Sequence, residues 1–260
     1  MANHLKHDMR IATWNVNSIR VRLQQILEFI KQYKVDTLLM QEIKCTNELF
    51  PYKIFESIGF NCVVYGQKSY NGVSIISKYQ INDIHFGNSI FNNDEARYID
   101  ALINGLRTAC VYVPNGQEVG IPYYFYKLEF LDTLIEYLSK MVPSERTILG
   151  GDFNVTRSDI DVWNPQLWHG KNCCSDAERK KFQVLLDLGL RDIPREISNS
   201  REIFTWWDYR RQDFKFNCGL RLDYILTSEN VDVLSWQRCI KMRQLPRPSD
   251  HIPIIMDIKD

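Results

Sequence analysis

One segment, RTILGGDFN at residues 146–154, shows the pattern that decides the fold of this chain. Its apolar and β-branched first part, residues 146–149, predicts a buried strand. Polar residues, among them Asp152 and Asn154, follow where that strand is expected to end. Side chains beyond strand ends carry much of the chemistry of α/β proteins. A Gly-Gly-Asp sequence alone is typical of a turn, however, so a single segment of this kind predicts no function.

Four further segments repeat this arrangement of an apolar run with polar residues at one end. They are WNVNS at 14–18, QEIK at 41–44, RLDY at 221–224 and SDHIP at 249–253, beside runs at 10–13, 35–40, 221–227 and 252–258. Each segment alone has an ordinary structural explanation, such as a turn, a capped loop or a solvated charge. Together they bring Asn, Glu, Asp and His side chains to one sheet edge, and this combination indicates a metal-dependent hydrolytic site.

Strand patterns recur along the rest of the chain, with helices between them. Further strands are predicted at 61–65, 73–77, 98–103, 109–113, 204–206 and 231–240. Apolar residues at helical spacing predict helices at about 19–30, 122–138 and 176–188. The expected helix ends are an N-cap at Asn17 or Ser18, a first position at Pro122 and a C-terminal stop at Gly189.

So many strands with few helices do not fit a purely parallel, doubly wound sheet. The pattern predicts an α/β fold, a four-layer α/β sandwich in which two mixed β-sheets pack face to face with helices outside. Because no linker or repeat divides the chain, residues 9–260 are expected to form a single domain. Residues 1–8 are expected to be a disordered or frayed extension, with Met9 as an alternative start.

The composition, with 45% hydrophobic and 25% charged residues, is ordinary for a globular protein in water. No window is apolar enough to span a bilayer, and the polar first eight residues predict no signal peptide. The seven cysteines show no CxxC spacing and support neither a zinc site nor a disulfide framework. A cytoplasmic protein that makes no membrane contact is therefore expected.

The charge of the chain is balanced, whereas nucleic-acid enzymes often carry an excess of basic residues. One basic stretch, residues 238–247, contains Arg238, Lys241, Arg243 and Arg247 and no acid. It precedes the SDHIP segment, so we interpret it as a patch that faces phosphate, with a solvated surface as the alternative.

Hydrolysis of a phosphodiester needs more than acid–base chemistry. General acid–base catalysis supplies about 10²- to 10⁴-fold, far short of what so slow a reaction requires. A divalent cation and fixed donors around the phosphate must supply the rest. Oxygen ligands such as Glu42 and Asp250 favour Mg²⁺, with Mn²⁺ as a substitute.

The five segments resemble those of the endonuclease/exonuclease/phosphatase superfamily and, within it, the exonuclease III type of abasic-site endonuclease. Further similar segments follow in the same order, namely YVPNG at 112–116, TWWDYR at 205–210 and GL at 219–220. The resemblance extends from Met9 nearly to the C-terminus. It is specific, because the lipid phosphatases of the superfamily do not share the YVPN and WWDY segments.

The resemblance implies a role for each matching residue. Glu42 is expected to be the principal metal ligand, and the other metal-site positions are Asn15, Asp250, Asp152 and Asn154. Asp152 and Asn154 are also expected to orient or activate the attacking water. His251 is expected to bind phosphate, while Asp223 holds its tautomer and favours its protonated form.

The remaining matching positions are expected to contact DNA. Tyr112 and Asn115 resemble contacts to the phosphate or the leaving group, and Trp206 and Leu220 resemble the apolar wall that receives a base-less sugar. Arg210 and Asn17 complete the expected DNA-binding residues; Asn17 stands where some relatives have Asp, which leaves a second metal open. Other residues are expected outside the site, including Lys44 and Arg97, and no role is predicted for Cys173 and Cys174.

The implied activity is Mg²⁺-dependent hydrolysis of the phosphodiester 5′ of an abasic site in double-stranded DNA, leaving a 3′-hydroxyl. A 3′→5′ exonuclease and a 3′-phosphatase acting on 3′ blocks remain open as accompanying activities, and a monomer is expected. One alternative is another superfamily enzyme, such as an inositol polyphosphate phosphatase or a sphingomyelinase. Another is an inactive relative that binds RNA, which would require losses at the catalytic positions that this sequence does not show.

Overall fold

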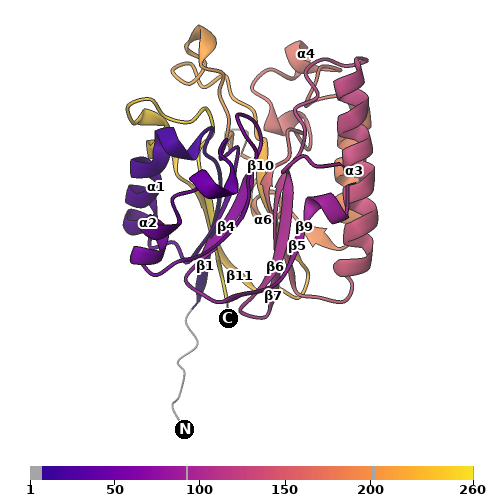
Figure 1. Cartoon of the computed structure of the whole chain (residues 1–260). Coiled ribbons are helices and arrows are strands. Elements are labelled where there is room, and N and C mark those ends of the chain that lie inside the picture. The colour runs from indigo at the N-terminus through magenta and orange to yellow at the C-terminus, as the bar shows by residue number, and fades with distance from the viewer. Residues whose placement is uncertain (1–7, 92, 201–202, 260) are drawn as a thin grey trace.

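Two six-stranded mixed sheets face each other in the computed structural model, which describes residues 8–91, 93–200 and 203–259 (Figure 1). The first sheet has the order β11 (Val233–Arg238), β12 (Ile254–Ile258), β1 (Met9–Asn15), β2 (Thr37–Gln41), β4 (Val73–Ser77), β3 (Asn61–Tyr65). The second has the order β5 (Ile81–Phe86), β6 (Tyr98–Ile103), β7 (Leu106–Tyr112), β8 (Thr147–Asp152), β10 (Asp223–Ser228), β9 (Leu190–Arg191). The predicted four-layer sandwich is confirmed.

Helices cover the outer faces of both sheets. Helices α1 (Ile19–Tyr33) and α2 (Tyr52–Ser57) pack on the first sheet, and α3 (Pro122–Met141) and α5 (Asp176–Asp187) pack on the second (Figure 1). The shorter elements are α4 (Pro165–Trp168), α6 (Ile193–Ile197), η1 (Asn47–Leu49), η2 (Gly87–Ser89), η3 (Asp159–Asp161), η4 (Arg210–Gln212) and η5 (Ile240–Gln244). Within the described part of the chain, no helix is long and apolar enough to cross a membrane.

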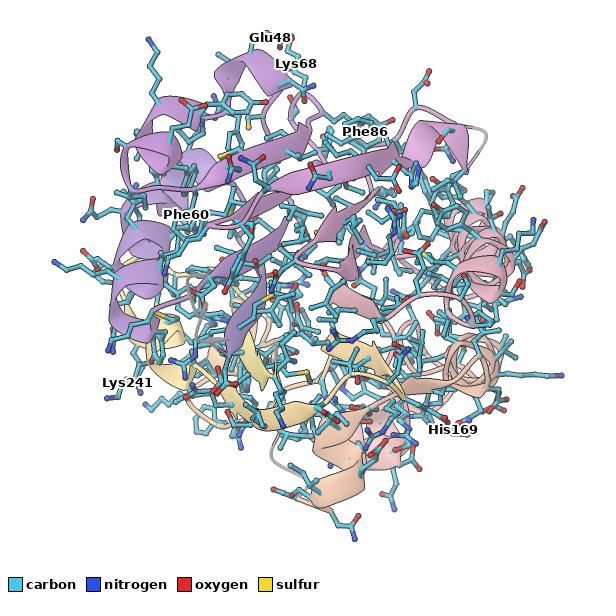
Figure 2. All side chains as sticks on the ribbon, turned by 90° about the horizontal axis from the view of Figure 1, so that it is seen from below. Glu48, Phe60, Lys68, Phe86, His169 and Lys241 are labelled. Carbon is cyan, nitrogen blue, oxygen red and sulfur yellow. The ribbon has the colours of Figure 1, made fainter. Side chains whose placement is uncertain are left out.

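Three apolar layers hold the sandwich together. Residues such as Ile11, Leu39 and Ile225 fill the space between the sheets. Trp14 and its neighbours pack against α1 and α2, and a third cluster packs the second sheet against α3 and α5. Figure 2, seen from below, shows side chains filling the interior between the sheets and beneath the helices. Burial of this apolar surface is the main stabilising contribution to such a fold.

The two glycines of the GGDFN segment lie inside β8 and do not form the turn that such a sequence often makes. A Cβ on Gly151 would lie 1.9 Å from the carbonyl oxygen of Val111 on the neighbouring strand β7. A Cβ on Gly150 would lie 2.6 Å from Leu39 Cδ1 of the opposite sheet. The glycines therefore let β8 approach both neighbours closely, directly before Asp152.

Most predicted strands and all three predicted helices are found, with shifts of a few residues at their ends. Residues 204–206 are an exception, because Trp206 makes only isolated bridges to Leu220 and His251. Strands β5 and β9 were not predicted; β5 is largely exposed, so its apolar alternation is weak, and β9 has two residues. Ser18 is the N-cap of α1 but makes no side-chain capping bond. The predicted extension lies outside the described residues, apart from Asp8.

Candidate active site

Strand register brings the predicted polar residues to one edge of the two sheets. In the second sheet, Asp152 pairs with Tyr112 of the parallel strand β7 and with Asp223 of the antiparallel strand β10. In the first sheet, Asn15 ends β1 and pairs with Gln41, so Glu42 follows at the same level. The carboxyl ends of four strands therefore meet the amino ends of β10 and β12 here. The first sheet therefore contributes Asn15 and Glu42 to the site, and the second contributes Asp152 and Asp223.

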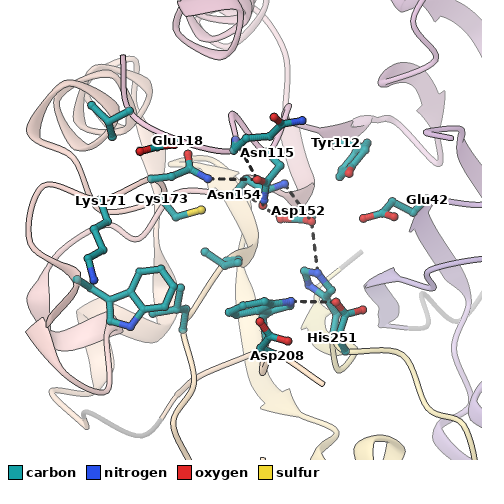
Figure 3. A pocket seen from close by; sticks show the side chains of 18 of the residues that line it. Glu42, Tyr112, Asn115, Glu118, Asp152, Asn154, Lys171, Cys173, Asp208 and His251 are labelled. Carbon is teal, nitrogen blue, oxygen red and sulfur yellow. Dashed lines mark hydrogen bonds and ion pairs between the residues drawn. The ribbon is translucent and has the colours of Figure 1, made fainter. Parts of the chain in front are cut away.

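Asn15 joins the two halves of the site. Its fully buried side-chain amide donates to Glu42 Oε1 at 2.8 Å and to Asp152 Oδ2 at 2.9 Å, while its oxygen accepts the backbone N–H of Asn17. Glu42 has a positive φ of 51°, which costs free energy in a residue other than glycine. Figure 3 shows Glu42, Tyr112, Asp152 and His251 pointing towards a common space. Asn15 thus holds two carboxylates side by side.

His251 is held between two buried carboxylates. Its Nδ1 lies 2.9 Å from Asp223 Oδ2, and because a carboxylate only accepts, Nδ1 carries the hydrogen. Its Nε2 lies 3.6 Å from Asp152 Oδ2. Thr205 supports the arrangement, since its hydroxyl accepts the backbone N–H of Asp223 at 3.1 Å. The Nε2 side of the ring therefore faces the catalytic space.

These charges alter the proton affinities of the group. Burial alone would lower the pKa of His251, but the Asp223 and Asp152 carboxylates raise it to about 10. Burial, with the neighbouring Asp223 carboxylate, raises the pKa of Asp152 to about 7 against the opposing effect of His251. His251 is therefore suited to bind an anion at neutral pH, and Asp152 to exchange a proton there.

We expect Asp223→Asn to lower the pKa of His251, because the substitution removes the anion that most favours the imidazolium. The imidazole ¹⁵N shifts of the metal-free protein, followed from pH 5 to pH 11, measure this directly. The titration midpoint should move from the alkaline range towards neutral pH, and the alkaline limb of a pH–rate profile should move in the same direction. An unaltered His251 midpoint would contradict the assigned pair.

Asn154 and Asn115 form the next part of the wall. Asn115 Nδ2 donates to Asn154 Oδ1 at 3.0 Å (Figure 3). Asn154 Nδ2 donates to the Val113 carbonyl. The Asn154 backbone N–H donates to Asp152 Oδ1 at 2.9 Å. Burial and nearby Glu42 raise the pKa of Tyr112 well above its usual range, so its hydroxyl stays a donor. These amides and the hydroxyl are fixed polar groups around one space.

Asp250, Asn17 and Trp206 lie on the opposite side. Asp250 Oδ1 accepts from Asn17 Nδ2 at 2.9 Å, and its Oδ2 accepts from the Trp206 indole N–H at 3.0 Å. Burial alone would raise the pKa of Asp250, but His251 and these two donors lower it. Asp250 is therefore a carboxylate at neutral pH, next to the charged imidazole.

A divalent cation fits the donors of this site. The one cluster of three potential metal-ligating side chains found among the described residues consists of Asp152, Asp223 and His251. His251 is a poor ligand, since Nδ1 is engaged and its raised pKa keeps a proton on Nε2. Glu42 and Asp152, held together by one amide, offer oxygens only, which suits a hard cation such as Mg²⁺. The metal-ligand roles of Asn15, Asn154 and Asp250 stay predictions.

A pocket of about 610 Å³ opens above these groups. The predicted residues that line it are Glu42, Tyr112, Asn115, Asp152, Asn154, Trp206, Arg210, Leu220, Asp250 and His251. Asn15, Asn17 and Asp223 lie behind this lining and bond to it. Apolar residues, chiefly Trp206, Leu220 and Leu222, form one wall, and polar side chains form the other. Arg210 lies at the rim, where its exposed side chain pairs with Asp208.

The structure corrects the expectations for Lys44 and for the stretch 238–247, whereas Arg97 stays outside the pocket lining as expected. Lys44 does reach the site, because its ammonium lies 2.8 Å from Glu42 Oε2 and 2.7 Å from Asn17 Oδ1. Arg97 lies over the ring of Tyr112, 4.8 Å from its centroid. In the basic stretch 238–247, Arg243 is buried over the ring of Tyr209, so it does not face phosphate.

One contributor, Lys127, had no sequence signal, because it lies within the apolar spacing of α3. Its fully buried ammonium donates to the backbone carbonyls of Asn115 and Asn154 and pairs with Glu178. Cys173, for which no role was predicted, lines the pocket. Its Sγ accepts a hydrogen bond from Lys127 Nζ at 4.0 Å. Lys127 therefore connects the loops that carry Asn115 and Asn154.

Comparisons with known proteins agree with this geometry. The sequence matches the Endonuclease/Exonuclease/phosphatase family over residues 12–251. Exodeoxyribonuclease III of Haemophilus influenzae is 34% identical over 96% of this chain and 100% of its own length. A 3′ phosphatase from Neisseria, solved with a product DNA hairpin, is 37% identical with a TM-score of 0.94 and coverage of 97% and 100%. An AP endonuclease from Archaeoglobus fulgidus is 36% identical with a TM-score of 0.91 and coverage of 95% and 98%.

Proposed function

Because the chain belongs to the endonuclease/exonuclease/phosphatase family, we propose that it is a metal-dependent DNA-repair nuclease that cleaves 5′ of abasic sites in double-stranded DNA. One observation carries the proposal. Asp152 lies between the Asp223–His251 pair and Glu42, at the floor of a pocket with one apolar wall. A charged imidazole, a proton-accepting carboxylate and oxygen ligands for a cation are the parts that phosphodiester hydrolysis needs.

In the proposed reaction, water held by Asp152 and Asn154 attacks the phosphorus and passes a proton to Asp152. In the metal-free protein, burial raises the pKa of Asp152 to about 7, so this carboxylate is a stronger base than an ordinary Asp. As the new O–P bond forms, the bond to the 3′ oxygen breaks, and that oxygen takes up a proton from solvent to become the 3′-hydroxyl. His251 donates to a phosphate oxygen as charge develops, and the Tyr112 hydroxyl donates to the same group.

Glu42 and Asp152 would hold the cation, which we propose to be Mg²⁺, with Mn²⁺ as a substitute. When bound, it would supply positive charge to a non-bridging phosphate oxygen. The Lys44 ammonium pairs with Glu42 Oε2, so the carboxylate has a defined orientation before DNA binds. The assignment rests on oxygen donors and on the Asn15 amide that joins the two carboxylates.

The apolar wall supports selectivity for a base-less sugar. Trp206, Leu220 and Leu222 offer no fixed hydrogen-bond pattern that would read a base, apart from the indole N–H already bonded to Asp250. An abasic nucleotide has no stacking or pairing to lose, so its extrusion costs less than that of a normal nucleotide. The enzyme would therefore recognise the ease of extrusion and the shape of the sugar.

Several finer assignments belong to the same proposal. The partner is double-stranded DNA with abasic sites or 3′ blocks, and the active form is a monomer in which residues 9–260 act as one domain. Cysteines without metal-binding spacing favour a cytoplasmic location. The 3′ phosphatase relative favours removal of 3′ blocks as an accompanying activity.

One assay tests the proposed function. A duplex with a single internal abasic analogue is incubated with Mg²⁺ or with EDTA, and both product ends are mapped. We expect one cut, a 3′-hydroxyl on the upstream fragment, and no product in EDTA. A second duplex with a 3′-phosphate and no abasic site measures the accompanying activity. The proposal fails if the abasic duplex stays intact while inositol phosphates are dephosphorylated, since that pattern identifies the rival enzyme class.

A further inference from the structure

A second hollow of about 420 Å³ adjoins the active pocket. We call it the tryptophan groove; its lining is Trp163, Leu167, Trp168, Lys171, Trp206, Asp208, Arg210, Asp213 and Cys218. Five of these residues, among them Trp168 and Trp206, also line the active pocket. The two hollows are therefore continuous, and Trp206 belongs to the wall of both. Trp163 and Leu167 line only the groove, so they distinguish it from the active pocket.

Hydrogen bonds and apolar packing fix the walls of the groove. The backbone N–H of Trp163 donates to the Gly219 carbonyl at 3.1 Å, and the Asn164 side chain caps α4 by accepting from the backbone N–H of Leu167. Trp168 and Trp206 pack against a buried cluster that includes Val162. The groove is thus held in shape by the loops that follow β8 and precede β10.

Large apolar side chains in the groove remain uncovered. Trp163 is 38% exposed and Leu167 is 46% exposed, although both lie in a concave surface. Uncovered aromatic groups in a hollow that continues from an active pocket are typical of a ligand site. The charges balance, because Lys171 and Arg210 stand against Asp208 and Asp213. A charge-balanced slot with exposed aromatic walls favours a neutral flat ring over a phosphate.

We propose that the tryptophan groove binds the base of an unpaired nucleotide whose sugar and phosphate lie in the active pocket. This rests on the proposed nuclease function, which places a sugar against the wall that Trp206 shares with the groove. Indole rings stack on any nucleobase, so the site needs no sequence preference. The groove would let the same catalytic centre act on a frayed 3′ terminus that still carries its base. Substrates with and without a base would then differ only in their use of the groove.

The test uses two duplexes that differ at one position. In the first, the 3′-terminal nucleotide is an unpaired 2-aminopurine, and in the second it is an abasic analogue. Binding is measured in EDTA, so that no cleavage occurs, by 2-aminopurine fluorescence and by anisotropy of a dye at the far end. Wild type should quench the 2-aminopurine on binding. Trp163→Ala should abolish the quenching and weaken binding of the base-containing duplex by roughly 5- to 100-fold. Its affinity for the abasic duplex should stay within about twofold.

Further variants make the result specific. Trp163→Phe keeps an aromatic face and should restore much of the affinity, and Leu167→Ala should lose part of it. Leu234→Ala is the matched control, because Leu234 is 52% exposed on β11 and lines neither hollow. If Trp163→Ala does not fold, the Phe and Leu167 variants carry the test. Equal effects on both duplexes, or none, overturn the groove assignment. If the nuclease proposal itself is wrong, the wild-type protein will leave the internal abasic duplex uncut in the cleavage assay described above.

Discussion

Asp152→Asn is expected to lower kcat for phosphodiester cleavage by about 10²- to 10⁴-fold while the protein stays folded. The amide has the shape of the carboxyl group but cannot take a proton from the attacking water. The folded protein raises the pKa of Asp152 to about 7. Ionising this buried carboxylate is therefore unfavourable, and the stability of the protein falls as the pH rises from the ordinary Asp pKa towards 7. Asn does not ionise, so at pH 8 the metal-free variant should unfold at or above the wild-type temperature.

Steady-state cleavage of an abasic duplex and a thermal unfolding scan measure the two effects. Asp187→Asn is the control, because this exposed residue ends α5 far from the site and should change neither quantity. A variant that cleaves at near the wild-type rate would remove Asp152 from the proton transfer. A large fall in unfolding temperature would show instead that the carboxylate is a structural anion.

Lys127→Met should destabilise the protein by about 3–5 kcal/mol, the usual cost of leaving one partner of a buried ion pair unpaired. Lys127 and Glu178 are both fully buried, and Glu178 also accepts from the backbone N–H groups of Cys173 and Ser175. Without the ammonium, the carbonyls of Asn115 and Asn154 lose their donor as well. Denaturant unfolding measures the stability, and kcat should fall in the fraction that folds.

Two further variants separate the effect of burial from the effect of the unpaired charge on stability. Lys140 pairs with Glu136 on the exposed face of the same helix, so Lys140→Met should cost less than about 0.5 kcal/mol. Adding Glu178→Gln to Lys127→Met removes the unpaired charge and should recover part of the lost stability. If the single and double variants are equally unstable, the loss comes from packing of the lysine chain and the ion pair is not its cause.

The sequence indicated which polar residues lie near one another, but it did not indicate how they are arranged. Asp152 and His251 stand out because each polar group follows or precedes an apolar run, which is a local signal. The pairing of Asp152 with Asp223 has no local signal, because three α-helices, two 3₁₀-helices and the short strand β9 lie between their strands in the described part of the sequence. The conversion of His251 into a stable imidazolium depends on that register, so it could not be predicted from composition or spacing.

The errors also have physical causes. Residues 204–206 have the aromatic composition of a strand, but the neighbouring backbone at Leu220 and Ile252 belongs to loops, so only isolated bridges form. Lys127 lies within the apolar spacing of α3, where a lysine gives no sign of a site, and its ammonium meets loops that are distant in sequence. Lys44 was placed outside the site, but its positive φ of 51° turns it back towards Glu42. Contacts between distant segments decided the first two cases, and local backbone geometry decided the third.

The position of β12 within its sheet has a consequence for the newly made chain. β12 is synthesised after every other described strand, yet it lies between β1 and β11 and pairs with β1 along its whole length. His251 lies three residues before β12, so the imidazole can reach Asp223 only when this strand has inserted. A ribosome-bound chain that lacks β12 would have an open edge in its first sheet and an incomplete catalytic centre. Folding and the ability to cut DNA should therefore appear together, in one late step of synthesis.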